Sequence, residues 1–137
     1  MKSDSNIAIK EVMSSDELKK FVMFPHTLYK DSKYWVAPII KEELEVLNKE
    51  TNPVFNNAVA HYFLAYIDGE IVGRIAALIN WIEVKDLKKK KVRFGWFDFI
   101  DDQNVSKALL EKVIEIGKKN NLEFIEGPVG FSNMDKA

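Results

Sequence analysis

The first candidate for chemistry is a carboxyl group in the middle of an aromatic stretch. Asp98 lies in the run Arg-Phe-Gly-Trp-Phe-Asp-Phe-Ile at residues 93–100, whose composition predicts a strand. Burial among aromatic side chains favours the uncharged form of a carboxyl group, which suits a general base. The alternative is a structural carboxylate that pairs with Arg74 or Arg93. The sequence alone leaves both interpretations open.

The second candidate is the segment that follows this strand. Residues 101–107 read Asp-Asp-Gln-Asn-Val-Ser-Lys and have the residue types of a helix start. The first amides of a helix are unpaired donors at the positive end of its dipole, so an anion can bind there. Two carboxylates at the same place would repel an anion, at a cost of about 1–4 kcal/mol per charge pair. Asp101 or Asp102 also has a simpler role as the helix cap.

Other groups of reactive side chains carry weaker signals. Lysines at 85 and 88–91 could meet phosphate groups, but acidic residues interrupt them and a solvated loop explains them as well. His26 and His61 are isolated and lack metal-ligand spacing, and cysteine is absent, so we expect no metal site. Four early aromatic residues could line an acceptor pocket or pack the core: Phe24, Tyr29, Tyr34 and Trp35.

Composition limits the class of protein. The chain has 137 residues, 47% of them hydrophobic, which suits one globular domain with a real core. The net charge of −1 gives no general attraction to nucleic acid or to an anionic membrane. No apolar run is long enough to span a bilayer, and the polar first residues do not resemble a signal peptide. We therefore expect a cytoplasmic protein without nucleic-acid or membrane partners.

The elements that must position these residues follow from periodicity and turn signals. Residues 61–80 predict a central hairpin, because Asp68-Gly69 suits a type I′ turn and both faces of its strands are apolar. Pro25 should end the first helix near Phe24. The predicted elements are a strand at 6–12, helices from 14 and from 38, the hairpin, a strand at 93–100, a helix to 119 and a strand at 123–126. The order β-α-α-β-β-β-α-β predicts a mixed α/β sheet whose last two strands are parallel.

This element order resembles the GNAT (GCN5-related N-acetyltransferase) superfamily. Four motifs resemble a group of poorly characterised bacterial GNAT-like proteins: Phe-Pro-His-Thr-Leu-Tyr-Lys at 24–30, Tyr-Trp-Val-Ala-Pro at 34–38, Phe-Gly-Trp-Phe-Asp-Phe-Ile-Asp-Asp at 94–102 and Gly-Pro-Val-Gly-Phe-Ser-Asn-Met-Asp at 127–135. Members of that group are longer. The resemblance therefore implies that residues 1–137 form a single GNAT-like domain, the N-terminal part of a longer protein, that lacks the final helix and two strands. The fifth strand would then expose an edge, through which we expect self-association into a homo-oligomer, such as a dimer.

The resemblance also implies a function and a site. It suggests an acyl-CoA-dependent N-acetyltransferase that uses acetyl-CoA or another acyl-CoA and an unidentified amine acceptor, without a metal. Asp98 would be the catalytic base, alone or through a bound water. The residues implied to contact the cofactor are Phe99, Ile100, Asp101, Gln103, Asn104, Val105, Ser106, Lys107 and Asn133. Because the spaced glycines usual at the helix start are missing here, the alternative is a non-catalytic GNAT-like module for binding or assembly.

Overall fold

The computed structural model describes residues 6–127 and contains a five-stranded sheet between two helical layers. The elements in chain order are β1 (Ile7–Glu11), α1 (Ser15–Leu28), α2 (Ile40–Leu47), a short 3₁₀ helix (Pro53–Asn56), β2 (Ala58–Ile67), β3 (Glu70–Asn80), a single π-helical turn (Ile82–Asp86), β4 (Lys91–Phe99), α3 (Gln103–Lys119) and β5 (Phe124–Glu126). This order confirms the predicted α/β architecture.

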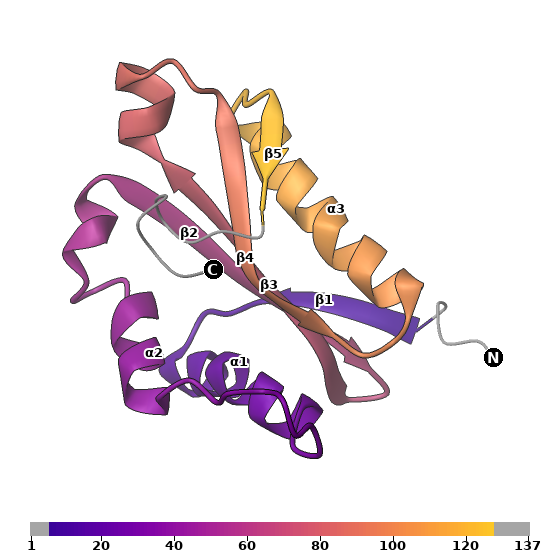
Figure 1. Ribbon diagram of the computed structural model, residues 1–137. Coiled ribbons are helices and arrows are strands. Elements are labelled where there is room, and N and C mark those ends of the chain that lie inside the picture. The colour runs from indigo at the N-terminus through magenta and orange to yellow at the C-terminus, as the bar shows by residue number, and fades with distance from the viewer. Residues whose placement is uncertain (1–5, 128–137) are drawn as a thin grey trace.

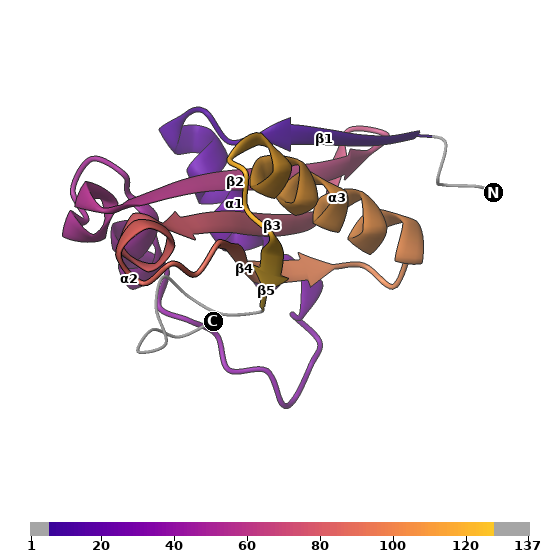
Figure 2. The ribbon, with the colours of Figure 1, turned by 90° about the horizontal axis from the view of Figure 1, so that it is seen from above.

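The strands lie in the sheet in the same order as in the chain. Strands β1 to β4 pair antiparallel with their neighbours, and β4 pairs parallel with β5, so the sheet is mixed as predicted. Figures 1 and 2 show α1 and α2 together on one face and α3 on the other. No helix within residues 6–127 is both long enough and apolar enough to cross a membrane.

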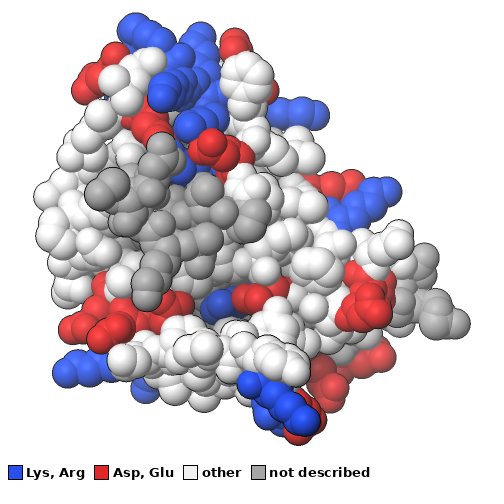
Figure 3. Space-filling view, in the orientation of Figure 1, with Lys and Arg blue, Asp and Glu red and all other residues white. Residues whose placement is uncertain are grey.

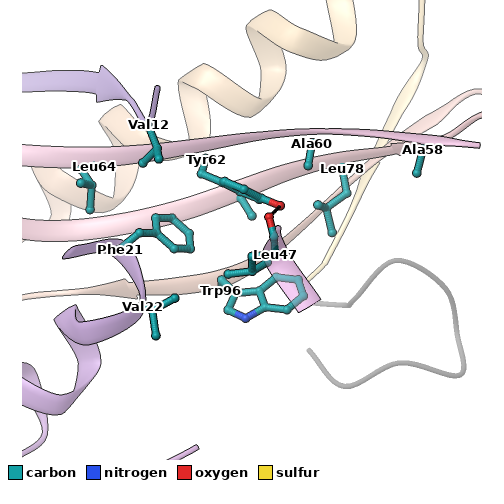
Figure 4. Close-up of a cluster of buried hydrophobic side chains, with 11 residues drawn as sticks. Val12, Phe21, Val22, Leu47, Ala58, Ala60, Tyr62, Leu64, Leu78 and Trp96 are labelled. Atoms are coloured by element: carbon teal, nitrogen blue, oxygen red, sulfur yellow. Dashed lines mark hydrogen bonds between the residues drawn. The ribbon is translucent and has the colours of Figure 1, made fainter. Parts of the chain in front are cut away.

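Each face of the central hairpin is covered by its own apolar cluster. On the α1/α2 face, Phe21 and Leu47 pack against Tyr62 and Leu78 (Figure 4). The Tyr62 hydroxyl donates a hydrogen bond of 2.8 Å to the Leu47 carbonyl, and burial raises the pKa of this phenol. On the α3 face the cluster includes four residues of α3 that are spaced three or four apart: Val105, Leu109, Val113 and Ile116. A hairpin that is apolar on both sides therefore lies at the centre of the molecule.

The predicted hairpin turn and the predicted cap of α3 are both confirmed. Asp68 and Gly69 both have positive φ, at 51° and 81°, as a type I′ turn requires. The Asp102 carboxylate caps α3 by accepting a bond from the amide of Asn104. Asn121, with φ of 58°, makes the left-handed turn after α3.

The predicted end of α1 at Phe24 is wrong. The helix continues through Pro25 to Leu28, and the amide of Tyr29 still donates to the carbonyl of Pro25. A proline inside a helix costs the bond that its missing N–H would make. Here α1 is held by tertiary packing, because Phe21, Val22, Phe24 and Pro25 are all buried. The carbonyl that Pro25 leaves without its helical partner becomes part of the candidate site.

Candidate functional site

A bulge in β4 organises the site. Arg74 of β3 pairs with Asp98, and Ala76 pairs with Gly95, so Trp96 and Phe97 together face a single residue of β3. Trp96 has a φ of 47°, a conformation that costs a non-glycine residue on the order of 1–3 kcal/mol. Such strain persists only where surrounding contacts hold it.

The bulge reverses the direction of the side chains that follow it. Before it, Val92 and Phe94 belong to the cluster under α3; after it, Phe97 and Phe99 do. An uninterrupted strand would have placed residues of even and odd number on opposite faces throughout. The extra residue turns Trp96 toward the α1/α2 cluster and leaves Asp98 on that face as well.

Asp98 accepts hydrogen bonds on both carboxylate oxygens. The Tyr29 hydroxyl donates to Oδ1 at 2.8 Å, and Arg74 Nε donates to Oδ2 at 2.9 Å. Arg74 Nη2 also lies 2.9 Å from Oδ2, and the two side chains are only 5% and 18% exposed. Burial, and then the bond to Asp98, raise the pKa of Tyr29 to about 12. Burial lowers the pKa of Arg74, and the Asp98 charge acts in the opposite direction.

Arg74 also contacts α1 directly. Its Nη1 donates to the carbonyl of Phe21 at 2.9 Å, and its guanidinium carbon lies 5.1 Å from the centre of the Phe21 ring. Phe21 is four residues before Pro25, so its carbonyl has no intrahelical N–H to accept. One planar side chain therefore joins α1, β3 and β4.

Two further contacts connect the helical layer with the site. Trp96 Nε1 donates to Glu43 Oε1 of α2 at 2.9 Å, so α2 holds the bulged residue. The ring of Trp35 lies 5.3 Å from that of Tyr29 and 5.2 Å, edge-on, from that of His26. Tyr34 is 92% exposed and Phe24 is buried, so the four aromatic residues noted in the sequence do not form one group.

Charged atoms reach the surface beside this face. Figure 3 shows acidic and basic atoms side by side in a recess between the sheet and the layer of α1 and α2. The same view shows a concentration of basic residues at the end of the molecule where the π-helical turn leads into β4. There Lys85 and residues 88–90 are exposed, as a solvated loop predicts.

The described pairing of the two parallel strands ends shortly before the bulge. β5 pairs with β4 only over Lys91, Val92 and Arg93. Gly127 then passes so close to Phe94 that an added Cβ would lie 2.5 Å from its carbonyl oxygen. Within residues 6–127 no strand pairs with the remaining length of β4 on this edge, from Gly95 to Phe99.

Several backbone amides at the start of α3 already have acceptors within the chain, which disfavours anion binding there. The Asp102 carboxylate accepts from the Asn104 amide at 2.9 Å, and the Asp102 carbonyl lies 3.1 and 3.3 Å from the amides of Val105 and Ser106. These three amides are thus engaged within the chain. The Ser106 hydroxyl donates to the carbonyl of Gln103 at 3.0 Å.

The predicted cofactor residues lie along one path but differ in exposure. Asp101, Gln103, Asn104 and Lys107 are exposed, whereas Val105 is fully buried beneath the sheet. Phe99 and Ile100 are partly buried in the cluster under α3. Asn133 lies outside the described residues. The assignment of these residues to a cofactor, and of Asp98 to proton transfer, stays a prediction, as does self-association through β5.

The sequence reasoning missed Tyr29, Pro25 and Arg74 as parts of one arrangement. One signal was available: Arg74 is the single charged residue in the otherwise apolar stretch 71–79. A charged side chain in a buried strand must have partners. The sequence named Arg74 only as a possible partner of Asp98, which the structure confirms.

Solved structures identify the fold. An acetyltransferase from Clostridium acetobutylicum, solved with acetyl-CoA, matches with a TM-score of 0.64 at 14% identity, over 88% of this chain and 79% of that one. A Staphylococcus aureus acetyltransferase of the GNAT family matches at 0.60 and 18% identity, over 90% and 74%. This chain has a GNAT-like fold. An aminoglycoside acetyltransferase from a soil metagenome, solved with sisomicin, adds a third GNAT-like neighbour at 0.62 and 15% identity, over 94% and 81%.

Sequence comparison gives two curated relatives of this GNAT-like chain. Protein YghO of Escherichia coli is 32% identical over 120 residues, which are 88% of this chain and 30% of YghO. A bacterial ceramide synthase of Caulobacter vibrioides is 27% identical over 131 residues, 95% of this chain and 34% of that protein. The chain thus spans about a third of the length of these relatives. No family model matches it.

Proposed function

We propose that the complete protein transfers an acyl group from an acyl-CoA to an amine, and that this chain supplies the bulged strand at the centre of the site. The observation that carries the proposal is the largely buried Asp98 beside the β4 bulge, which is held by hydrogen bonds on both carboxylate oxygens. The GNAT-like fold supports it, as does the acetyl-CoA in the solved neighbour from Clostridium acetobutylicum.

The edge of a strand suits an extended arm that contains amides, because strand backbone groups can bind such a chain as an added strand would. An acyl thioester supplies an activated carbonyl carbon, and transfer forms a C–N bond while the C–S bond breaks and the amine proton passes finally to the sulfur. In this chain the backbone of Phe97–Phe99 would hold the arm. Phe99, Ile100 and the start of α3 would follow it toward its phosphates.

Asp98 is our candidate to accept the amine proton, directly or through a water. Both of its oxygens already accept hydrogen bonds, from Tyr29 and Arg74. Proton transfer to Asp98 therefore requires one of these donors to move or to share its oxygen. The substitution Asp98→Asn should abolish transfer if this role is correct.

A second function has a specific observation in its favour. The amides of Asn104, Val105 and Ser106 are engaged by Asp102, and no glycine lies at the helix start to let the backbone surround a phosphate. A helix start whose amides are bonded within the chain suits a GNAT-like module that binds or assembles without catalysis.

Thermal melting with acyl-CoA separates the two functions. A ligand that binds the folded state raises the melting midpoint by an amount that grows with its concentration. We expect a rise with acetyl-CoA or octanoyl-CoA for this chain or for a longer version that continues past Ala137. If neither ligand raises the midpoint of either version at millimolar concentration, the transferase proposal is wrong and the non-catalytic module stands.

A matched pair of variants tests where the phosphates lie. Asp101 is exposed at the start of α3, and replacing it by Asn removes one repulsive charge, so Asp101→Asn should tighten binding a few-fold at low salt. Asp16→Asn, at the start of α1, removes the same charge elsewhere and should leave affinity unchanged. Equal affinities for both variants and the parent would place the phosphates away from α3.

A further inference from the structure

We propose that Arg74 is a positioning residue that fixes the Tyr29–Asp98 pair beside the β4 bulge, and that its contact with α1 depends on Pro25. This inference rests on the proposed transfer reaction, in which Asp98 accepts the amine proton. The arrangement itself can be tested without any acyl donor.

The first step is the carbonyl of Phe21. In an uninterrupted helix the N–H of residue 25 would donate to it, and proline has no N–H. Arg74 Nη1 takes that place at 2.9 Å. Pro25 therefore leaves a buried acceptor on the side of α1 that faces the sheet, and Arg74 satisfies it.

The second step is the geometry of the guanidinium. Its donors lie in one plane with fixed directions, so fixing one edge of the group also fixes the other. The edge formed by Nε and Nη2 meets Asp98 Oδ2, while Nη1 meets α1. A lysine has a single ammonium group and cannot reproduce both contacts at once.

The third step is the placement of Tyr29. Its amide donates to the carbonyl of Pro25, and its hydroxyl donates to the Asp98 oxygen that Arg74 leaves free. The end of α1 is thus attached to β4 through Asp98 on one side and through Arg74 on the other. The orientation of the Asp98 carboxylate beside the β4 bulge follows from these two attachments.

A purely structural ion pair would behave differently. Replacing a buried pair changes stability, sometimes only slightly. Loss of the Arg74 charge by itself would raise the pKa of Tyr29 further, because that charge lowers it. A positioning role predicts that Tyr29 loses its shielded environment when the arginine fork or its anchor on α1 is altered, even if the protein stays folded. The readout must therefore be the state of Tyr29 itself.

The test follows the ionised fraction of Tyr29 at pH 11, from the ¹³Cζ chemical shift of labelled tyrosine, with Tyr29→Phe to assign the signal. An ordinary phenol, with a pKa of about 10, is mostly ionised at that pH. Tyr29 in the parent protein should be mostly protonated, and in Arg74→Lys mostly ionised. Pro25→Ala restores an N–H that competes for the Phe21 carbonyl, so it should give an intermediate fraction. Thr27→Ala, at an exposed position of the same helix, is the matched control and should match the parent.

Circular dichroism at the same pH shows which variants remain folded. Pro25→Ala removes a helix breaker, so it provides the decisive result if Arg74→Lys unfolds. A parent-like Tyr29 signal in folded Pro25→Ala and in every folded Arg74 variant would overturn the positioning role. Because no acyl-CoA is present, that result would leave the proposed transfer function untouched, and a failure to bind acyl-CoA would leave this result untouched.

Discussion

A buried arginine lies at each end of β4, Arg93 within the strand and Arg74 on the neighbouring strand β3, and the two have different surroundings. Arg93 and Arg74 are the buried charged residues of the part of the chain that the structure describes, at 1% and 5% exposure. Arg93 lies where β5 pairs with β4, and Arg74 lies opposite the bulge, where the pairing has ended. We call the end of β4 that pairs with β5 the closed end. We call the other end, where no strand of residues 6–127 pairs with that edge, the open end.

The partners explain the difference. Arg93 forms ion pairs with Glu83 of the π-helical turn and with Glu126 of β5, so two carboxylates from adjacent segments surround it. Arg74 has one carboxylate, a helix carbonyl and the ring of Phe21. Arg93 neutralises two carboxylates and links β4 to β5 through Glu126. Arg74 instead connects α1, β3 and β4 through a single carboxylate at the open end. Burial of an arginine alone does not reveal which of these roles it has.

The largest expected effect comes from removing the arginine at the closed end. Arg93→Met leaves two carboxylates facing each other with Glu83 only 12% exposed, so we expect a loss of about 3–5 kcal/mol in the free energy of unfolding. Arg74→Met should cost less, because Asp98 keeps its bond from Tyr29 and is 18% exposed. Urea denaturation of both variants measures the difference.

Hydrogen exchange sharpens this contrast. In Arg93→Met the amides of β5 should lose protection before those of β3, because Glu126 no longer has Arg93 as a partner. Arg74→Met should leave β5 protected. A larger stability loss for Arg74→Met than for Arg93→Met would reverse the roles assigned to the two ends.

A smaller effect is expected at the bulge. Glu43→Ala removes the charged acceptor of the Trp96 indole, and hydrogen bonds to charged groups contribute about 1.5–3 kcal/mol. We expect a loss near the lower end of that range, with an upfield shift of the Trp96 indole proton. Glu43→Gln keeps an acceptor oxygen, so it should recover most of the stability and most of the parent indole proton shift. Glu42→Ala, at an exposed neighbouring position in α2, is the matched control. An unchanged indole signal in Glu43→Ala would mean that α2 does not hold the bulge.

The framework around the site was predictable from the sequence because local rules decide it. The Asp68-Gly69 turn, the stripe of α3 and the parallel β4–α3–β5 unit follow from turn chemistry, helical period and chain connection. Each depends on residues close together in the chain. The packing of two helical layers on the hairpin then follows from its two apolar faces.

The open end was not predictable in the same way. Aromatic residues at 94, 96, 97 and 99 suit either face of a strand, so their pattern conceals a one-residue bulge. In hindsight, the change from even positions before Gly95 to odd positions after it marks the bulge. Pro25 favoured a helix end by local rules, and its tolerance depends on tertiary packing and on Arg74, which is 49 residues away in the chain.

The smallest expected effect concerns the exposed rim of the closed end. A hydrogen bond from Lys91 lowers the pKa of Glu126 below its ordinary value of 4.5. Because the folded state has the lower pKa, Glu126 contributes stability above the ordinary glutamate pKa, and this contribution disappears as the pH falls through the folded value. Its side chain is 43% exposed, so we expect less than about 1 kcal/mol.

The measurement compares the free energy of unfolding at pH 7 and pH 3 for the parent, Glu126→Gln and the control Glu123→Gln. Glu126→Gln should lose less stability than the parent on acidification, because it has no carboxylate to protonate, while the exposed Glu123→Gln should follow the parent. The difference should shrink in high salt, since solvent screens this pair. Equal acid sensitivity in all three proteins would mean that Glu126 adds nothing at the rim. The stability of the closed end would then depend on the buried Arg93–Glu83 pair alone. Each arginine would have one carboxylate partner that contributes to stability, and the two arginines would no longer differ in this respect.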